Sequence, residues 1–281
     1  MDAEARARAM DLLGRFNDDL TRAVDAVFGT RWAEIEEMVA LIALARDGVI
    51  TTRDMAEISA LGRRAVSRLI LRLKDAGLVD TRPSPHDGRA VEVVLADNGR
   101  ERAEDLRSRA VGLLQGSREL ALELGTLLRV DDAEVPPPVV DPLALLLDAG
   151  ISGAKLVGYM PVAATRGRMA ARQRAALVYV ATVGEVRPGA LAEPLEVSHA
   201  GVAYLVDQLC TKGFLRRHRD EVVGDKRAVV LRVTPEGMDA VASVARGITQ
   251  ERVDLSRLFQ QIAAWRPAAA VRRSREVDAT P

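Results

Sequence analysis

Apolar residues recur at helical spacing along much of this chain. Over residues 31–46 they stand at positions i, i+3, i+4 and i+7, as Ile35, Met38, Val39 and Ile42. This spacing predicts an amphipathic helix that ends at Asp47-Gly48, where Gly48 is a suitable C-cap. A short second helix is expected around Thr52–Ile58, with Thr51 or Thr52 capping its free amides.

Residues 62–76 have the pattern of a third helix. One face carries the apolar side chains Val66, Leu69, Ile70 and Leu73, and the other faces carry Arg63, Arg64, Ser67, Arg68 and Arg72. Gly77 is expected to end this helix. Two β-strands, at about 78–82 and 91–95, then flank a turn that is rich in Pro and Gly. The segment therefore predicts three helices followed by a β-hairpin.

The same pattern occurs again at an offset of 136 residues. This offset aligns Gly48 with Gly184, Val66 with Val202, Leu69 with Leu205, Leu73 with Leu209 and Gly77 with Gly213. Asp87 and Arg89 align with Asp225 and Arg227 at an offset of 138, which a two-residue insertion before the second hairpin tip explains. Such self-similarity indicates a duplicated structural unit.

Three successive prolines at residues 136–138 indicate a boundary, because proline cannot continue a helix and favours an extended spacer. The predicted organisation is a first unit over residues 1–130, a Pro-rich linker over 131–140, a second unit over 141–265 and a disordered tail over 266–281. Apolar residues at helical spacing flank the three helices and the hairpin within the first unit, and they predict long packing helices. They are Leu12, Leu13, Phe16, Leu20, Val24 and Val27 before it, and Leu106, Val111, Leu113, Leu114, Leu120, Leu124 and Leu127 after it.

The overall charge does not indicate a nucleic-acid partner, because 40 basic residues balance 40 acidic ones. Local charge does: residues 60–90 carry seven basic side chains against three acidic ones. Arginines on an exposed helix can bond guanine bidentately in the major groove, and an arginine at a hairpin tip can enter the minor groove. The charge pattern thus indicates double-stranded DNA as the partner.

The remaining residues argue against several other classes of protein. The only cysteine, Cys210, excludes an intramolecular disulfide, and with His86, His199 and His218 it forms no zinc-binding spacing, so no metal or cofactor is expected. Cys210 is interpreted as a structural thiol. No nucleophile elbow, phosphate loop or metalloprotease motif is found, which argues against an enzyme. No run approaches the roughly 18 apolar residues of a membrane span, and the chain opens with mixed charges, so a cytoplasmic protein without membrane contact is expected.

Both halves resemble the MarR family of bacterial transcriptional regulators. In the first half, the run from Arg64 to Val79 resembles the family's recognition helix and following strand, and Asp87-Gly88-Arg89 resembles its Asp-x-Arg wing tip. In the second half, residues 198–209, 225–227 and 231–237 match the helix, the tip and the exit into the last helix. The resemblance covers residues 31–105 and 170–245.

This resemblance implies a mainly α fold with small β-wings, in which two winged helix-turn-helix domains are joined by long dimerisation-type helices as a single-chain pseudo-dimer. It also implies a repressor of transcription, either a monomeric pseudo-dimer or a homodimer, that a small lipophilic or aromatic effector releases from DNA. The DNA-reading helices would be residues 62–76 and 198–212. The residues expected to contact DNA are Arg63, Arg64, Ser67, Arg68, Arg72, Arg82, Asp87, Arg89, Ser198, His199, Tyr204, Arg216, Arg217, Arg219, Asp225, Lys226 and Arg227.

The second recognition helix differs from the first in its chemistry. Ser67 and Arg68 correspond to Ala203 and Tyr204, and Arg63 and Arg64 correspond to His199 and Ala200. Its basic residues lie instead at 216–219, on the first strand of the wing, which suits phosphate contact more than base readout. We therefore expect asymmetric recognition of DNA. The alternative is that the second unit binds a protein or senses a ligand without touching DNA.

Overall fold

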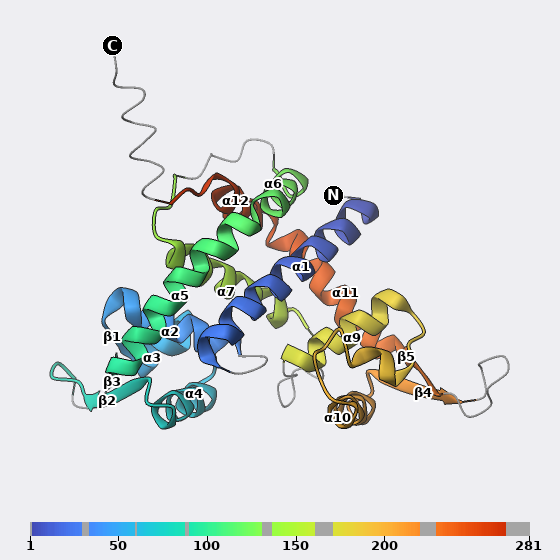
Figure 1. Ribbon diagram of the computed structural model, residues 1–281, viewed down its shortest axis with the longest axis horizontal. Coiled ribbons are helices and arrows are strands. Elements are labelled where there is room, and N and C mark those ends of the chain that lie inside the picture. Colours follow the sequence, from blue (N-terminus) through green and yellow to red (C-terminus); the bar gives the residue numbers. More distant parts are fainter. Residues whose placement is uncertain are drawn as a thin grey trace, which may run out of the picture. The chain divides into compact units, whose positions relative to one another are not determined.

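The computed structural model describes residues 2–29, 34–59, 61–87, 90–130, 137–160, 171–219 and 229–267 (Figure 1). Its contacts group the chain into two units. Unit 1 comprises Met1–Lys155 together with Ile248–Pro281, and unit 2 comprises Leu156–Gly247. The predicted domain boundaries stay a prediction, but the grouping differs from them, because the last helix of the chain packs in unit 1.

The helix-turn-helix part of unit 1 consists of α2 (Ile35–Asp47), α3 (Thr52–Ile58) and α4 (Arg63–Asp75). These bounds confirm the three predicted helices, except that residues 31–33 lie outside the described part. Gly48 caps α2 with a φ of 75°, and its amide donates to the Leu44 carbonyl. The Thr51 hydroxyl accepts a hydrogen bond from the Asp54 amide at 3.1 Å, so the predicted cap of α3 is formed.

The strands of unit 1 form one antiparallel sheet. β1 (Val49–Thr51), β2 (Val79–Pro83) and β3 (Val91–Leu95) pair in the order β1-β3-β2. The β2–β3 hairpin is the predicted wing. β1 was not predicted, because a strand of three residues is too short to give a periodic signal. Val93 on β3 pairs with a residue of β1 and with a residue of β2, and it is fully buried, so the centre of the sheet belongs to the core.

The described part of unit 1 also contains the helices α1 (Ala3–Phe28), α5 (Asp97–Gly116), α6 (Arg118–Leu127), α7 (Pro142–Gly158, shared with unit 2 beyond Lys155) and α12 (Arg252–Ala264). α1 packs along α5 and α6, and α12 packs against α6. The rings of Phe16 and Phe259 meet edge to face at 5.1 Å. Arg252 donates to the Leu128 carbonyl at 3.0 Å. These contacts explain why the last helix belongs to unit 1.

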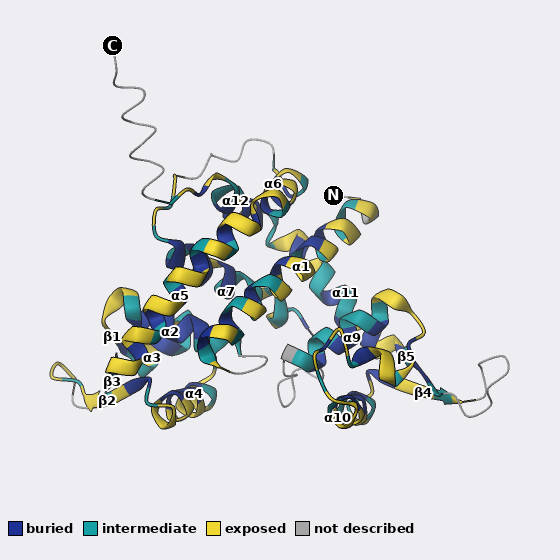
Figure 2. Cartoon of the chain, in the orientation of Figure 1, coloured by how far each residue is buried: buried dark blue, intermediate teal, exposed yellow. Residues whose placement is uncertain are grey.

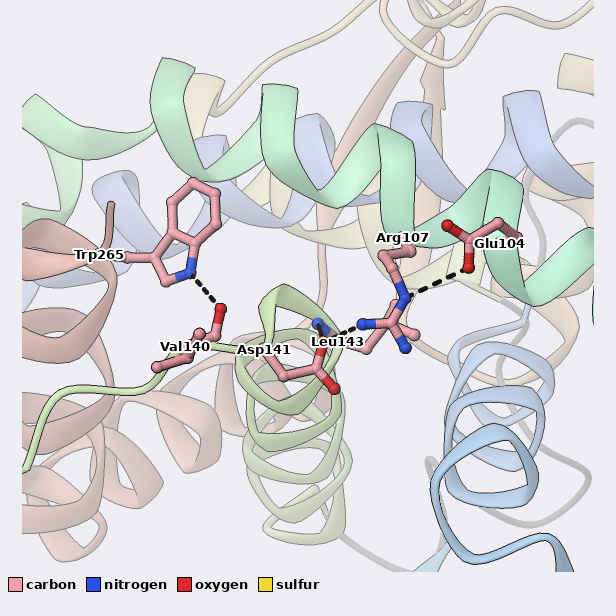
Figure 3. Close-up of polar contacts among 6 residues, drawn as sticks. All are labelled: Glu104, Arg107, Val140, Asp141, Leu143 and Trp265. Atoms are coloured by element: carbon pink, nitrogen blue, oxygen red, sulfur yellow. Dashed lines mark hydrogen bonds and ion pairs between the residues drawn. The ribbon is translucent and has the colours of Figure 1, made fainter. Parts of the chain in front are cut away.

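The end of the predicted linker is attached to unit 1 (Figure 3). The Trp265 indole donates to the Val140 carbonyl at 3.2 Å, and the Gln261 amide donates to the Pro137 carbonyl at 3.1 Å. Asp141 accepts from Arg107 on α5 at 2.5 Å and from the Leu143 amide at the start of α7. Residues 137–141 are thus fixed by hydrogen bonds. The rest of the predicted linker, 131–136, and residues 268–281 of the predicted disordered tail lie outside the described part.

Unit 2 has the same order of elements as the winged part of unit 1. Helix α9 (Ala171–Val183) is followed by a 3-10 helix, η1 (Pro188–Leu191), and by α10 (His199–Thr211). Strands β4 (Leu215–Arg219) and β5 (Val229–Val233) form an antiparallel hairpin, and α11 (Pro235–Gln250) follows. A single bridge between Val186 and Leu231 stands where unit 1 has β1.

Aligned residues of the repeat have equivalent structural roles. Gly77 and Gly213 follow α4 and α10 with φ values of 68° and 80°, a region that side chains with a Cβ rarely adopt. Gly99 and Gly237 lie where a helix passes close to the backbone: a Cβ would come within 2.0 Å of the Leu78 carbonyl oxygen or 2.4 Å of the Phe214 carbonyl oxygen. Backbone geometry therefore accounts for the glycines that the two halves share.

The structure confirms a mainly helical fold with small antiparallel sheets. Within the described ranges, no helix has both the length and the apolar character that crossing a membrane requires. The single-chain pseudo-dimer stays a prediction.

Candidate nucleic-acid interface

α4 has an exposed side and a buried side (Figure 2). Its apolar residues Val66, Leu69, Ile70 and Leu73 are all buried and hold the helix on the core, as predicted. Helical periodicity then leaves Arg63, Arg64, Ser67 and Arg68 exposed. The guanidinium groups of the three arginines make no hydrogen bond or ion pair with any described residue. Three uncompensated positive charges therefore lie on the first two turns of α4.

Arg72, one helical turn further on, is in a different situation. Its Nε lies 3.0 Å from Oε1 of Glu37 on α2, and the Glu37 side chain is only 18% exposed. This ion pair joins α4 to α2 and compensates the charge of Arg72. The sequence grouped Arg72 with the other arginines, because nothing in the spacing of residues 37 and 72 indicates their contact.

The base of the first wing is held by a buried carboxylate. Glu92 on β3 lies opposite Arg82 on β2 and is bonded to its Nε at 2.9 Å. Ser84 donates to the other Glu92 oxygen at 2.9 Å, and the His86 amide donates to the Ser84 hydroxyl at 3.3 Å. The hydrogen bonds from Arg82 and Ser84 lower the pKa of Glu92. Glu92 was not among the predicted site residues, although the register of the expected hairpin could have paired it with Arg82.

The tip of the first wing is only partly described. Asp87 is exposed there, and Arg89 lies outside the described residues. The DNA contacts predicted for the tip therefore stay predictions.

α10, which corresponds to α4, exposes a different chemistry. Its apolar face is buried like that of α4 and consists of Val202, Leu205, Val206 and Leu209. The Ser198 hydroxyl caps the start of the helix by accepting a hydrogen bond from the Gly201 amide at 3.2 Å. The exposed face carries His199, Ala200, Ala203 and Tyr204, whose ring is prominent at 63% exposure. α4 contains five basic residues and one acidic residue, whereas α10 contains no basic residue and one acidic residue, Asp207.

Three of the arginines predicted to contact DNA in unit 2, Arg216, Arg217 and Arg219, lie on β4, as predicted, but they are not equivalent. Arg217 Nη2 is bonded to Asp207 Oδ1 of α10 at 2.5 Å, so its charge is compensated. Strand alternation places Arg219 on the same side as Arg217, and Arg216 on the other. Arg216 and Arg219 are exposed, and their guanidinium groups make no hydrogen bond or ion pair with a described residue. Asp225, Lys226 and Arg227 lie outside the described part.

Cys210 lies on α10 and is partly buried. Burial raises the pKa of its thiol, with smaller effects from Arg217, which lowers it, and Asp207, which raises it. The thiol form is therefore favoured at neutral pH. Among the residues that the structure describes, no group of three or more His, Cys, Asp or Glu side chains could hold a metal ion.

Helices α2–α4 followed by the β2–β3 hairpin constitute a winged helix-turn-helix domain, with α4 in the position of the recognition helix. Residues 35–90 match the model of the MarR family. This segment, which runs from α2 to the tip of the wing, is a MarR family winged-helix domain.

Several solved structures are similar to parts of the chain. One is a double mutant of ZitR from Lactococcus lactis, with 19% sequence identity and a TM-score of 0.30. The match covers 36% of this chain and 64% of the ZitR chain. Another is a cysteine-to-serine mutant of MarR from E. coli in complex with operator DNA, with 21% sequence identity and a TM-score of 0.32. The match covers 43% of this chain and 83% of the MarR chain. RV1404 from Mycobacterium tuberculosis has 22% sequence identity and a TM-score of 0.35, and the match covers 52% of this chain and 94% of the RV1404 chain. This chain thus spans less than two thirds of ZitR. A search of the curated proteins found no significant match.

Proposed function

We propose that this protein is a transcriptional regulator that binds double-stranded DNA through two winged-helix units in one chain. The observation that carries the proposal is the exposed face of α4, where Arg63, Arg64 and Arg68 form no ion pair with any residue that the structure describes. This face belongs to a MarR family winged-helix domain. Arg72 and Arg82, by contrast, are paired with Glu37 and Glu92.

The proposed mechanism uses α4 as the reader of the major groove. Arg64 and Arg68 lie four residues apart, so they share one helix face and can both reach base edges. A guanidinium can bond the O6 and N7 atoms of guanine simultaneously, and Ser67 can bond either bases or phosphates. Arg72, held by Glu37, would set the orientation of α4 rather than read bases.

The repeated order of elements in unit 2 supports a second DNA-binding unit in the same chain. Two readers would engage successive major grooves if their helices were about 34–36 Å apart. Occupation of a promoter by such a protein would repress transcription. A small lipophilic or aromatic effector that changes the spacing of the readers would release the DNA. The effector and the repression are proposed from the family resemblance.

The test is a salt-dependent binding measurement on a fragment selected from genomic DNA by the full chain. Arg64→Ala and Arg68→Ala should each lower affinity by about ten- to a hundredfold, on the basis of about 1–3 kcal/mol for a bidentate contact. Arg118→Ala is the matched control, because Arg118 is exposed on α6, outside the winged domain. Unchanged affinity in both α4 variants would exclude α4 as the reader.

A second candidate function has support in unit 2. α10 lacks basic residues and uses Asp207 to bind Arg217, which suits a protein-binding or ligand-sensing module better than a DNA reader. On this alternative, Arg217→Ala and Arg227→Ala would leave DNA affinity unchanged and would instead impair assembly. A footprint confined to one half-site would favour it.

A further inference from the structure

We infer that the two winged-helix units divide the work of DNA binding: unit 1 reads the sequence, and unit 2 contributes phosphate contacts that do not depend on sequence. This inference rests on the proposed function. It predicts an operator with one specific half-site and one permissive half-site, instead of the inverted repeat that two identical readers would select.

The first step concerns what α10 can read. Its exposed residues on the first two turns are His199, Ala200, Ala203 and Tyr204. Base discrimination in the major groove depends on side chains that offer two hydrogen bonds in a fixed geometry, such as Arg for guanine or Asn and Gln for adenine. None of these four side chains is of that kind. α10 therefore lacks the groups with which Arg64 and Arg68 would select guanine.

The second step concerns the charge of the surface around α10. The Asp207 side chain is 61% exposed, and a carboxylate near DNA repels the phosphates. Its bond to Arg217 cancels that repulsion and at the same time occupies the arginine. The helix and its nearest wing residue are thus electrostatically neutral. This arrangement permits close approach to DNA but adds little attraction.

The third step concerns the arginines that remain. Three exposed arginines make no hydrogen bond or ion pair through their guanidinium groups with any described residue: Arg216 and Arg219 on β4, and Arg187, the N-cap residue of η1. All three lie on a strand or a helix start, outside the helix that would enter the groove. In protein–DNA complexes, contacts from such elements fall mainly on phosphates, and they position the protein without selecting a sequence.

The experiment measures the affinity of the full chain for its selected operator and for a scrambled duplex of equal length. Arg216→Ala/Arg219→Ala should weaken binding to both duplexes by the same factor, roughly 60-fold in 100 mM salt, and should reduce the salt slope by about 2. Arg64→Ala/Arg68→Ala should weaken operator binding far more than binding to scrambled DNA. Arg118→Ala again serves as the control. All the replaced side chains are exposed, so unchanged thermal unfolding should accompany each result.

A footprint and the base preferences of the selected fragments complete the test. The expected result is protection over two half-sites with sequence preference in only one. Equal sequence preference in both half-sites would overturn the inference. Loss of affinity when thymine is replaced by uracil in the second half-site would also overturn it, because it would show that Ala200 or Ala203 reads the thymine methyl group. Protection of one half-site alone would also overturn it, while leaving DNA binding by unit 1 intact. Failure to bind any duplex would instead overturn the proposed function.

Discussion

If unit 2 contacts phosphates as proposed, Asp207→Asn should make this protein bind DNA more tightly. The change removes the acidic group of α10 and retains the size of the side chain. It also weakens the bond to Arg217, whose Nη2 lies 2.5 Å from the Asp207 oxygen. The guanidinium then becomes available to a phosphate.

The structure sets the size of both effects. The two side chains of the pair are 61% and 40% exposed, so the pair contributes at most about 1 kcal/mol to folding, and the stability of the protein should hardly change. One additional phosphate contact steepens the dependence of log affinity on log salt by about 0.9. Relative to 1 M salt, this slope gives a gain of about eightfold at 100 mM and about threefold at 300 mM.

The assay is fluorescence anisotropy with a labelled duplex over 100–300 mM salt, using a scrambled sequence and the selected operator. Asp239→Asn is the matched control, because it removes the same charge from an exposed residue of α11, outside the helix-turn-helix. The expected gain is equal on both duplexes. If Asp207→Asn leaves affinity unchanged at 100 mM, or if the control raises affinity equally, the α10–β4 surface does not lie against DNA.

Three further outcomes test the structure itself. Gly99→Ala should lower the free energy of unfolding by about 1–3 kcal/mol, because its Cβ would overlap the Leu78 carbonyl. Gly112→Ala in the same helix has open space and should raise it by roughly 0.5–1 kcal/mol, and urea titration would distinguish the two. The pKa of Glu92 is lowered in the folded state, so its stabilising effect is present above the ordinary carboxyl pKa and is lost as pH falls through the lower folded value. Glu92→Gln should therefore destabilise the protein at pH 7 but no longer do so near pH 3, and equal differences at both pH values would contradict the role of this carboxylate. Cys210 should react slowly with a disulfide reagent at pH 7.5 and rapidly in urea, because burial raises the pKa of its thiol; equal rates would show that the thiol is freely accessible.

The local elements were predictable because local patterns determine them. The helix expected at 62–76 is found at Arg63–Asp75, and the strand expected at 91–95 has those bounds. Both follow from apolar periodicity and from a glycine that ends the helix. A second copy of the pattern strengthened each assignment, since Gly77 and Gly213 occupy the same left-handed conformation.

The state of each charged side chain could not be predicted in this way. A count of charges treats Arg64, Arg72 and Arg82 alike, but Arg72 is bonded to a glutamate 35 residues away and Arg82 to one 10 residues away. Packing of α4 on α2 makes the first contact and strand register makes the second. The sequence therefore locates the basic segment, and only the tertiary structure distinguishes the arginines that pair with a glutamate from those that form no ion pair with a described residue.

The grouping of the helices also depends on contacts between distant residues. α12 was assigned to the second unit by its position in the chain, but it packs on α6 of unit 1. Its Trp265 further holds the Val140 carbonyl at the end of the linker. These contacts join residues more than 120 positions apart, for which the periodicity of a single sequence gives no signal.

The most direct test of sequence readout by α4 is the binding energy of every single-base variant of the operator, measured with the wild-type chain and with Arg68→Ala. The proposal predicts that Arg68→Ala loses its preference at one or two neighbouring base pairs of a single half-site and keeps it at the others. Uniform weakening at all positions, with every base preference unchanged, would contradict it and would make Arg68 a phosphate contact.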